Sequence, residues 1–201
     1  MAKLTEQEKY WVWLSSIDNI GPRRFYALLE WFEDVRNIWD SARVDNDALD
    51  RFGTKIKAAL VSARRDEYME DVLRRIEAAD CHVLTRLSGE YPAMLGEIVD
   101  PPPVLYWRGE SFLCDRAVSI VGTRRCTRTA QEVAVKLGRE LSGAGVTVVS
   151  GMARGVDSFA HQGALEGDSP TIAVLGCGVD VVYPPENRIL YDRIIRQGAV
   201  V

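Results

Sequence analysis

The chain has 201 residues, of which 47% are hydrophobic and 27% are charged. This balance is typical of a folded globular protein and excludes an intrinsically disordered chain. The net charge of −4 excludes a protein that is basic over its whole surface, although a local basic patch remains compatible with it.

Cellular location is indicated by three absences in the sequence. No apolar run approaches the ~20 residues that a membrane helix needs, and the first residues, Met1–Glu8, are too polar for a secretion signal. The four cysteines form no C-x-x-C pair, which argues against a zinc ribbon or a disulfide framework. We therefore expect a cytoplasmic protein with reduced thiols, no membrane span, no metal and no cofactor.

Residues 1–78 are predicted to form a small all-helical domain. Apolar residues recur at spacings of three and four from Tyr10 to Ile76, with an interruption at Gly21-Pro22. The tryptophans of this segment are expected in its core: Trp11, Trp13, Trp31 and Trp39.

The composition changes after Ala78, where the second predicted domain, residues 79–201, begins. Short strands are predicted at 81–85 and 104–107, separated by a loop-rich segment that ends in Pro101-Pro102-Pro103. Three consecutive prolines enforce an extended backbone, so we interpret them as a stiff connector.

From residue 117 onward, strands and helices alternate. Strands are predicted at 117–121, 146–149 and 171–175, helices at 129–141, 156–165 and 186–197, and a further strand at 199–201. This alternation predicts an α/β fold with a Rossmann-like, doubly wound, mainly parallel sheet, preceded by the helical domain. Because no helix follows the last strand, we expect the sheet to be incomplete at its C-terminal end.

Three glycine-rich loops follow these strands: Gly122–Arg125, Ser150–Gly155 and Gly176–Gly178. Each precedes a helix, so topology places all three at the carboxyl edge of the sheet, where such folds bind ligands. Helix N-termini carry unpaired N–H groups and partial positive charge, which favour an anion. Residues 117–154 contain six basic and only two acidic residues, and Arg124 and Arg154 lie in the loops, where a guanidinium can grip a phosphate.

The nature of the phosphate ligand follows by elimination. The first loop lacks G-x-G-x-x-G, which argues against a dinucleotide, and no G-x-x-x-x-G-K-[ST] segment is present, which argues against a P-loop nucleotide site. An extended chain of phosphates is the remaining natural ligand, and nucleic acid supplies it.

Five ordered blocks resemble the DNA-processing protein A (DprA/Smf) family: 119–125, 149–157, 161–165, 171–180 and 183–187. The resemblance implies a non-enzymatic protein that binds and protects single-stranded DNA and helps to load the RecA recombinase during natural transformation. It also implies a homodimer, whose interface in the family lies in a later part of the Rossmann-like region. Pro170 departs from the family pattern, which commonly has a basic residue there.

The same resemblance implies the DNA contacts. They are Gly122, Thr123, Arg124, Ser150, Gly151, Arg154 and Gly155. Arg125 is added to these DNA contacts because it is a basic residue in or beside the same loops, where a guanidinium can grip a phosphate. Secondary contacts are proposed at Tyr183, which can stack on a base, and at Gly21, Arg23 and Arg24. The last three belong to a segment that resembles a helix-hairpin-helix motif, so the helical domain is interpreted as SAM-like or helix-hairpin-helix-like.

Several alternatives remain open at this point. Ser150, His161 and Asp180 are the residue types of a hydrolase triad, and Asp157 with His161 could form half of a metal site. Cys177 is expected to be a small buried residue. The whole chain could instead be a nucleotide-binding phosphoribohydrolase, although the P-G-G-x-G-T-x-x-E loop of that family is missing, or an interaction module without a ligand.

Overall fold

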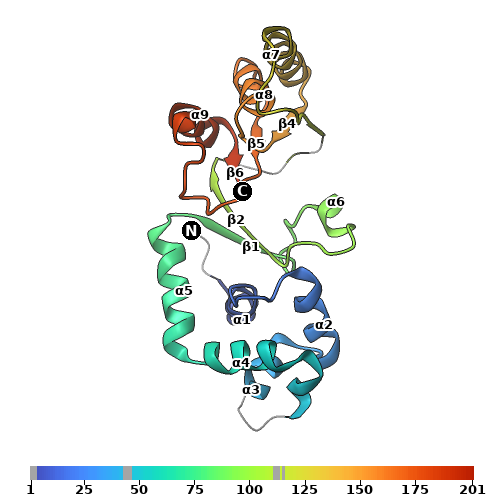
Figure 1. The fold of residues 1–201 in the computed structure, drawn as a ribbon, viewed down its shortest axis with the longest axis vertical. Helices are drawn as coiled ribbons and strands as arrows, with labels where there is room; N and C mark the ends of the chain where they lie inside the picture. The colour runs from blue at the N-terminus through green and yellow to red at the C-terminus, as the bar shows by residue number, and fades with distance from the viewer. Residues whose placement is uncertain (1–3, 43–46, 111–113, 115) are drawn as a thin grey trace. The chain divides into compact units, whose positions relative to one another are not determined.

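The computed structural model describes residues 4–42, 47–110, 114 and 116–201. The chain forms two compact units, residues 1–105 and 106–201 (Figure 1).

Helices dominate the first unit, as the sequence predicts. They are α1 (Glu6–Ser15), α2 (Pro22–Phe32), α3 (Val35–Ser41), the 3₁₀ helix η1 (Asp47–Phe52), α4 (Thr54–Ala63) and α5 (Asp66–Ala78). The break predicted at Gly21-Pro22 is the start of α2, where Gly21 is the N-cap and Pro22 the first helical residue. Helix α1 begins with a capping box, in which the Thr5 hydroxyl accepts from the Glu8 amide and the Glu8 carboxylate accepts from the Thr5 amide.

The core of this unit forms around Trp13, which is fully buried. Its indole Nε1 donates to the carbonyl oxygen of Ala63 at 2.8 Å, and its ring meets that of Trp39 edge-on with 4.9 Å between centroids. Trp11 is also buried, as expected. The expectation for Trp31 is wrong: it is 52% exposed, because it lies on the outer side of α2 under the guanidinium of Arg51, 3.6 Å from its ring centroid.

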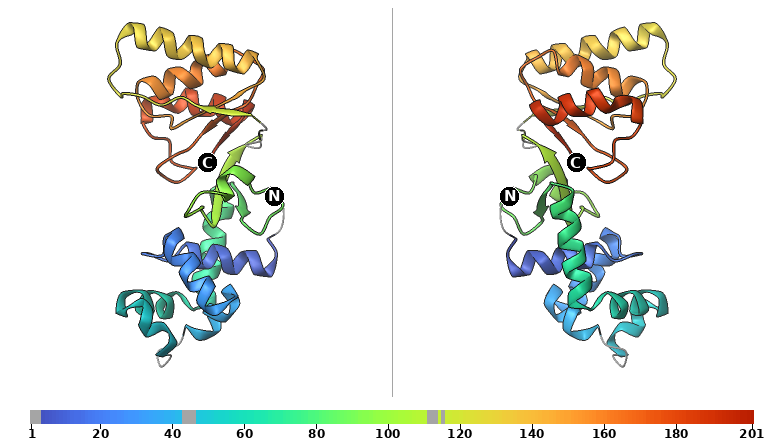
Figure 2. Two further views of the ribbon diagram at one scale, coloured as in Figure 1. Left: turned by 90° about the vertical axis from the view of Figure 1, so that its right-hand side faces the viewer. Right: turned by 90° about the vertical axis from the view of Figure 1, so that its left-hand side faces the viewer.

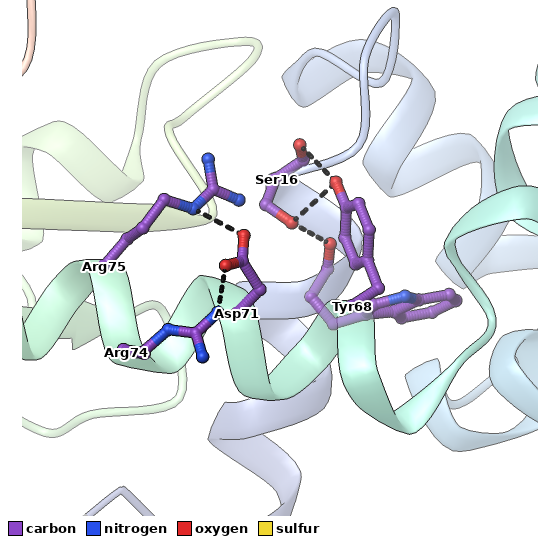
Figure 3. Close-up of polar contacts among 6 residues, drawn as sticks. Ser16, Tyr68, Asp71, Arg74 and Arg75 are labelled. Carbon is purple, nitrogen blue, oxygen red and sulfur yellow. Dashed lines mark hydrogen bonds and ion pairs between the residues drawn. The ribbon is translucent and has the colours of Figure 1, made fainter.

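Polar contacts also join α1 to α5 (Figure 3). The hydroxyl of Tyr68 donates to the carbonyl oxygen of Ser16 at 3.1 Å, which connects α5 to the C-cap of α1. One turn further along α5, Asp71 pairs with Arg74 at 2.5 Å and with Arg75 at 3.1 Å. These ion pairs lie within α5, are exposed and add little stability, so Tyr68 and the apolar core hold the two helices together.

The segment after α5 groups with the helices. It contains β1 (His82–Thr85), the single-turn helix α6 (Ala93–Gly96) and β2 (Val104–Gly109), whose first two residues end the unit. Residue 78, where the sequence composition changes, is the last residue of α5, and the boundary between the two compact units lies at 105/106.

The second unit alternates strands and helices as the sequence predicts. Its elements after β2 are β3 (Ala117–Ser119), α7 (Arg128–Gly143), β4 (Thr147–Ser150), α8 (Val156–Ala164), β5 (Thr171–Ala173), the 3₁₀ helix η2 (Pro185–Asn187), α9 (Arg188–Gln197) and β6 (Ala199–Val200). The order of the strands is β1-β2-β6-β5-β4-β3. Strands β3 to β6 are parallel to one another, and β2 is antiparallel to β6.

These observations confirm the α/β fold with a mainly parallel sheet after N-terminal helices. The consecutive order β3-β4-β5-β6 is the order found within one half of a doubly wound sheet. Because parallel crossovers are right-handed, this order brings α7, α8 and α9 to the same face of the sheet.

Two glycines allow α7 and α8 to lie directly side by side (Figures 1 and 2). A Cβ atom on Gly138 of α7 would lie 2.3 Å from the carbonyl oxygen of Ala160, and one on Gly163 of α8 would lie 2.0 Å from that of Val135. The helices thus meet backbone to backbone. Below them, Val148 of β4 is buried against Ala160 and Ala164 of α8.

Candidate nucleic-acid interface

The three glycine-rich loops lie at the carboxyl edge of the parallel strands, as the topology predicts. The first follows β3, the second joins β4 to α8, and the third follows β5. We call the first two, residues 122–125 and 150–155, the rim loops. Most of the predicted DNA contacts belong to them.

Asp157 joins the two rim loops. It is the second residue of α8, and its side chain is almost completely buried. One carboxylate oxygen accepts from the amide of Gly122 at 3.3 Å, and the other accepts from the amide of Gly151 at 3.1 Å. Both amides therefore already bond to a carboxylate of the protein itself, and the DNA contacts at Gly122 and Gly151 stay predictions.

Gly155 fits the second rim loop closely against the first. Its φ of +81° lies in the left-handed region, and a Cβ atom there would stand 2.2 Å from the carbonyl oxygen of Thr123. The next amide, that of Val156, donates to the same carbonyl at 3.3 Å. Gly155 thus acts through the shape of the backbone, and it positions Thr123 and Arg124.

The first rim loop presents its cationic side chains to solvent. Arg124 and Arg125 are exposed, and no ion pair within the described residues joins either of them to a carboxylate. The hydroxyl of Thr123 accepts from the amide of Arg125 at 3.2 Å, which closes the turn. Two consecutive exposed arginines, neither with an ion pair among the described residues, thus belong to this loop at the edge of the sheet.

Arg154 in the second rim loop has a different environment. Its Nε donates to Oε1 of Glu186 at 2.5 Å and its Nη2 donates to Oε2 at 3.3 Å, and both side chains are 53% exposed. These hydrogen bonds raise the pKa of Arg154 and lower the pKa of Glu186. In this arrangement Arg154 is thus engaged by a carboxylate, whereas Arg124 and Arg125 have no ion pair among the described residues.

The turn that carries Glu186 is fixed to the second rim loop. The side-chain amide of Asn187 donates to the carbonyl oxygen of Met152 and to the hydroxyl of Ser158, both at 2.8 Å. Tyr183 begins the turn and is 57% exposed, as a base-stacking residue has to be. Neither Glu186 nor Asn187 was predicted from the sequence to belong to the site, since only topology brings residues 183–187 next to residues 150–155.

The residues of the suggested hydrolase triad have other partners. The hydroxyl of Ser150 donates to the carbonyl oxygen of Ile120 at 2.6 Å, and the Nδ1 of His161 bonds to the hydroxyl of Thr171 at 2.8 Å. His161 is completely buried, and this burial lowers its pKa to about 4. No hydrogen bond within the described residues links Ser150, His161 and Asp180 into a proton relay.

Three further expectations from the sequence concern a metal site, the burial of Cys177 and a membrane span. No group of three or more metal-ligating side chains is found among the described residues, so Asp157 and His161 lack further ligands there. Cys177 is exposed, which makes the expectation of a buried residue wrong: the turn after β5 points it outward. A search of the same residues for a helix long and apolar enough to span a membrane found none.

In the first unit, Gly21, Arg23 and Arg24 line a surface cavity of about 500 Å³. Asp100 lines the same cavity, and the guanidinium of Arg24 donates to the carbonyl oxygen of Asn19 at 2.7 Å. The predicted secondary contacts thus lie together at the N-terminus of α2, but with a carboxylate beside them.

Residues 82–201 match the family model of DNA recombination-mediator protein A. The chain belongs to this family. It is 34% identical to Protein Smf of Synechocystis over 200 residues, which is 97% of this chain and 50% of that protein. It is 31% identical to the DNA processing protein DprA of Streptococcus pneumoniae over 193 residues, 96% of this chain and 65% of the relative.

Two solved structures are similar to this member of the recombination-mediator family. The crystal structure of DprA from S. pneumoniae aligns with a TM-score of 0.73 and 26% identity over 98% of this chain and 67% of that one. DprA from Helicobacter pylori, described for its single-stranded DNA binding mode, aligns with a TM-score of 0.53 and 31% identity over 61% of this chain and 55% of that one. The chain thus spans between half and two thirds of the length of each of these four proteins.

Proposed function

We propose that this chain binds single-stranded DNA at the rim loops, without catalysis, as part of DNA processing in recombination. The observation that carries the proposal is that Arg124 and Arg125 are exposed and have no ion pair in the described part of the chain, on a loop fixed by Asp157 and Gly155. Guanidinium groups bind phosphate oxygens through forked, charge-assisted hydrogen bonds. The single-stranded DNA binding named for the H. pylori relative supports the same ligand.

The residues of the proposed site have different roles in this proposal. Arg124 and Arg125 contact phosphates, and Thr123 shapes their turn. Gly122, Gly151 and Gly155 allow close backbone packing, and Ser150 holds the end of β4 against Ile120. Arg154 adds a further contact once it is free of Glu186.

The test is a titration of a fluorescently labelled oligo-dT at increasing salt. We expect the observed affinity to fall with a log–log slope of about −0.7 for each phosphate contacted. Arg124→Ala should weaken binding about tenfold or more and make the slope less steep by about 0.7, because it removes one charge-assisted contact.

Arg196→Ala is the matched control. It removes the same charge from an exposed position in the last turn of α9, away from the rim loops. If both variants bind like the parent chain, the assignment of the site is wrong. Release of free base from nucleoside monophosphates would instead favour a phosphoribohydrolase.

Family membership supports three further parts of the proposal. The first is a contact with the RecA recombinase, tested by whether the chain speeds RecA assembly on DNA coated with single-strand-binding protein. The second is a homodimer, tested by sedimentation equilibrium. The third is a cytoplasmic location, tested by cell fractionation.

A secondary DNA contact at the N-terminus of α2 is proposed from Gly21, Arg23 and Arg24. Helix N-termini attract phosphate, and Arg23 is exposed beside the cavity. Because Asp100 opposes an anion there, we expect Arg23→Ala to weaken oligonucleotide binding only about twofold. A loss as large as that of Arg124→Ala would make this the main site.

A further inference from the structure

Arg154 is the one rim-loop arginine that is already bound to a carboxylate. Glu186 approaches the Nε–Nη2 edge of its guanidinium with both oxygens, at 2.5 and 3.3 Å. A two-point contact of this kind is the strongest geometry that an exposed arginine can make with a carboxylate. It leaves only part of the guanidinium for another anion.

The position of Glu186 is built into the fold. Asn187, the next residue, is held by hydrogen bonds to Met152 and Ser158, so the turn moves together with the second rim loop. Ser158 in turn donates through its hydroxyl to the carbonyl oxygen of Ala153 at 2.5 Å. The carboxylate is therefore presented to Arg154 from a fixed backbone and not from a loose side chain alone.

A phosphate and this carboxylate compete for the same donors. An oligonucleotide that brings a phosphate to Arg154 either displaces Glu186 or accepts the repulsion of a carboxylate a few ångströms away. In both cases the intrinsic affinity of the rim loops for a polyanion is reduced. Arg124 and Arg125 carry no such restraint within the described residues.

We propose that Glu186 is an internal competitor for the DNA phosphate at Arg154, which lowers the affinity of the rim loops and eases the release of the strand. This inference rests on the proposed function. The other residues of the proposed site strengthen DNA binding, and the inference identifies one carboxylate that weakens it.

The experiment compares Glu186→Gln with the parent chain in the oligo-dT titration. The glutamine keeps the size and a hydrogen-bond acceptor but removes the charge. We expect binding to tighten about three- to tenfold and the salt slope to become steeper by about 0.7, because Arg154 gains a phosphate. In an Arg154→Ala background the same change should have little effect.

Glu166→Gln is the matched control. Glu166 pairs with Arg139 at 3.4 Å and is similarly exposed, but it follows the C-terminal end of α8, at the opposite edge of the sheet. Glu166→Gln changes the net charge by the same amount as Glu186→Gln, and we expect it to change the affinity for oligo-dT no more than twofold.

The outcomes separate the inference from the proposed function. If the parent chain binds through Arg124 and Glu186→Gln binds equally or more weakly, Glu186 orients Arg154 and the competitor is overturned while the proposed function stands. If Glu186→Gln and Glu166→Gln tighten binding equally, only net charge matters and the competitor is again overturned. If neither the parent chain nor Glu186→Gln binds oligo-dT, both are overturned.

Discussion

Asp157 shows how much of the site depends on one buried side chain. Its carboxylate accepts from the amides of Gly122 and Gly151, which belong to loops from different strands. At a helix N-terminus a carboxylate is also favoured by the helix dipole. An internal anion thus occupies the position that the sequence pattern suggests for a phosphate.

Replacing Asp157 should destabilise the second unit. Asp157→Ala leaves two backbone N–H groups without their acceptor, and we expect the free energy of unfolding to fall by about 1–3 kcal/mol. Urea denaturation measures this. Asp168→Ala, at an exposed position, is the control and should change the midpoint little; equal effects of the two would show that the bridge contributes nothing.

His161 should make stability depend on pH. The unfolded chain binds a proton near pH 6.5, but burial lowers the pKa of the folded state to about 4. Between these values the unfolded state holds more protons, so the free energy of unfolding should decrease as pH falls from 6.5 to 4, by at most about 3 kcal/mol. Chemical denaturation at several pH values measures the loss. An NMR titration in which the His161 ring gains its proton near pH 6.5 would contradict this.

At the scale of elements, the direct contact of α7 with α8 depends on glycine. Gly163→Ala places a methyl group where the carbonyl of Val135 stands, so we expect a loss of about 1–3 kcal/mol even though alanine favours helix by about 1 kcal/mol. Gly143→Ala at the end of α7 meets no atom within 4 Å and serves as the control. Thermal unfolding of both variants decides, and a Gly163→Ala variant as stable as Gly143→Ala would disprove the close contact.

Local pattern was sufficient to predict the helical character of residues 1–78 and most elements of the second unit. The apolar runs at 146–149 and 171–175 correspond to β4 and β5, and helices 129–141 and 156–165 correspond to α7 and α8 within three residues. Periodicity and the glycines between the runs contain that information. The exposed face of Trp31 was missed because a helix period does not reveal which side meets the core.

The site was predictable only in part, since its geometry depends on contacts between distant segments. The alternation of strands and helices can be recognised in the sequence, and the topology that it implies is enough to place the glycine-rich loops at one edge of the sheet. The pairing of Arg154 with Glu186 and of Asp157 with Gly122 joins residues 32 and 35 positions apart. No local pattern encodes such pairs. The sequence therefore identified the arginines of the site, but it did not show that Glu186 pairs with Arg154 or that Asp157 accepts from the amide of Gly122.

At the scale of the molecule, a net charge of −4 confines polyanion binding to a small area. Around that area, apolar side chains are exposed: Val121, Val174, Val181 and Tyr183. Unstacked bases can contact such side chains, whereas a duplex keeps its bases inside.

We therefore expect single-stranded DNA to bind at least about tenfold more tightly than a duplex of the same length. Tyr183→Ala should reduce the affinity for the single strand by about 1–3 kcal/mol without changing the salt slope, because stacking involves no counterion. Fluorescence anisotropy with both oligonucleotides measures the ratio. Equal affinity for the two forms would mean that the bases make no contact.

The bridge through Asp157 has a consequence for how the strand is held. Since one carboxylate accepts from both loops, any motion that displaces the Asp157 side chain releases both amides at once. We expect hydrogen exchange at the amides of Gly122 and Gly151 to proceed at a common rate and to slow in parallel when DNA is added. Slower exchange at both amides would then show that DNA covers both rim loops. If DNA contacts only one of the loops, the exchange rates of the two amides would differ.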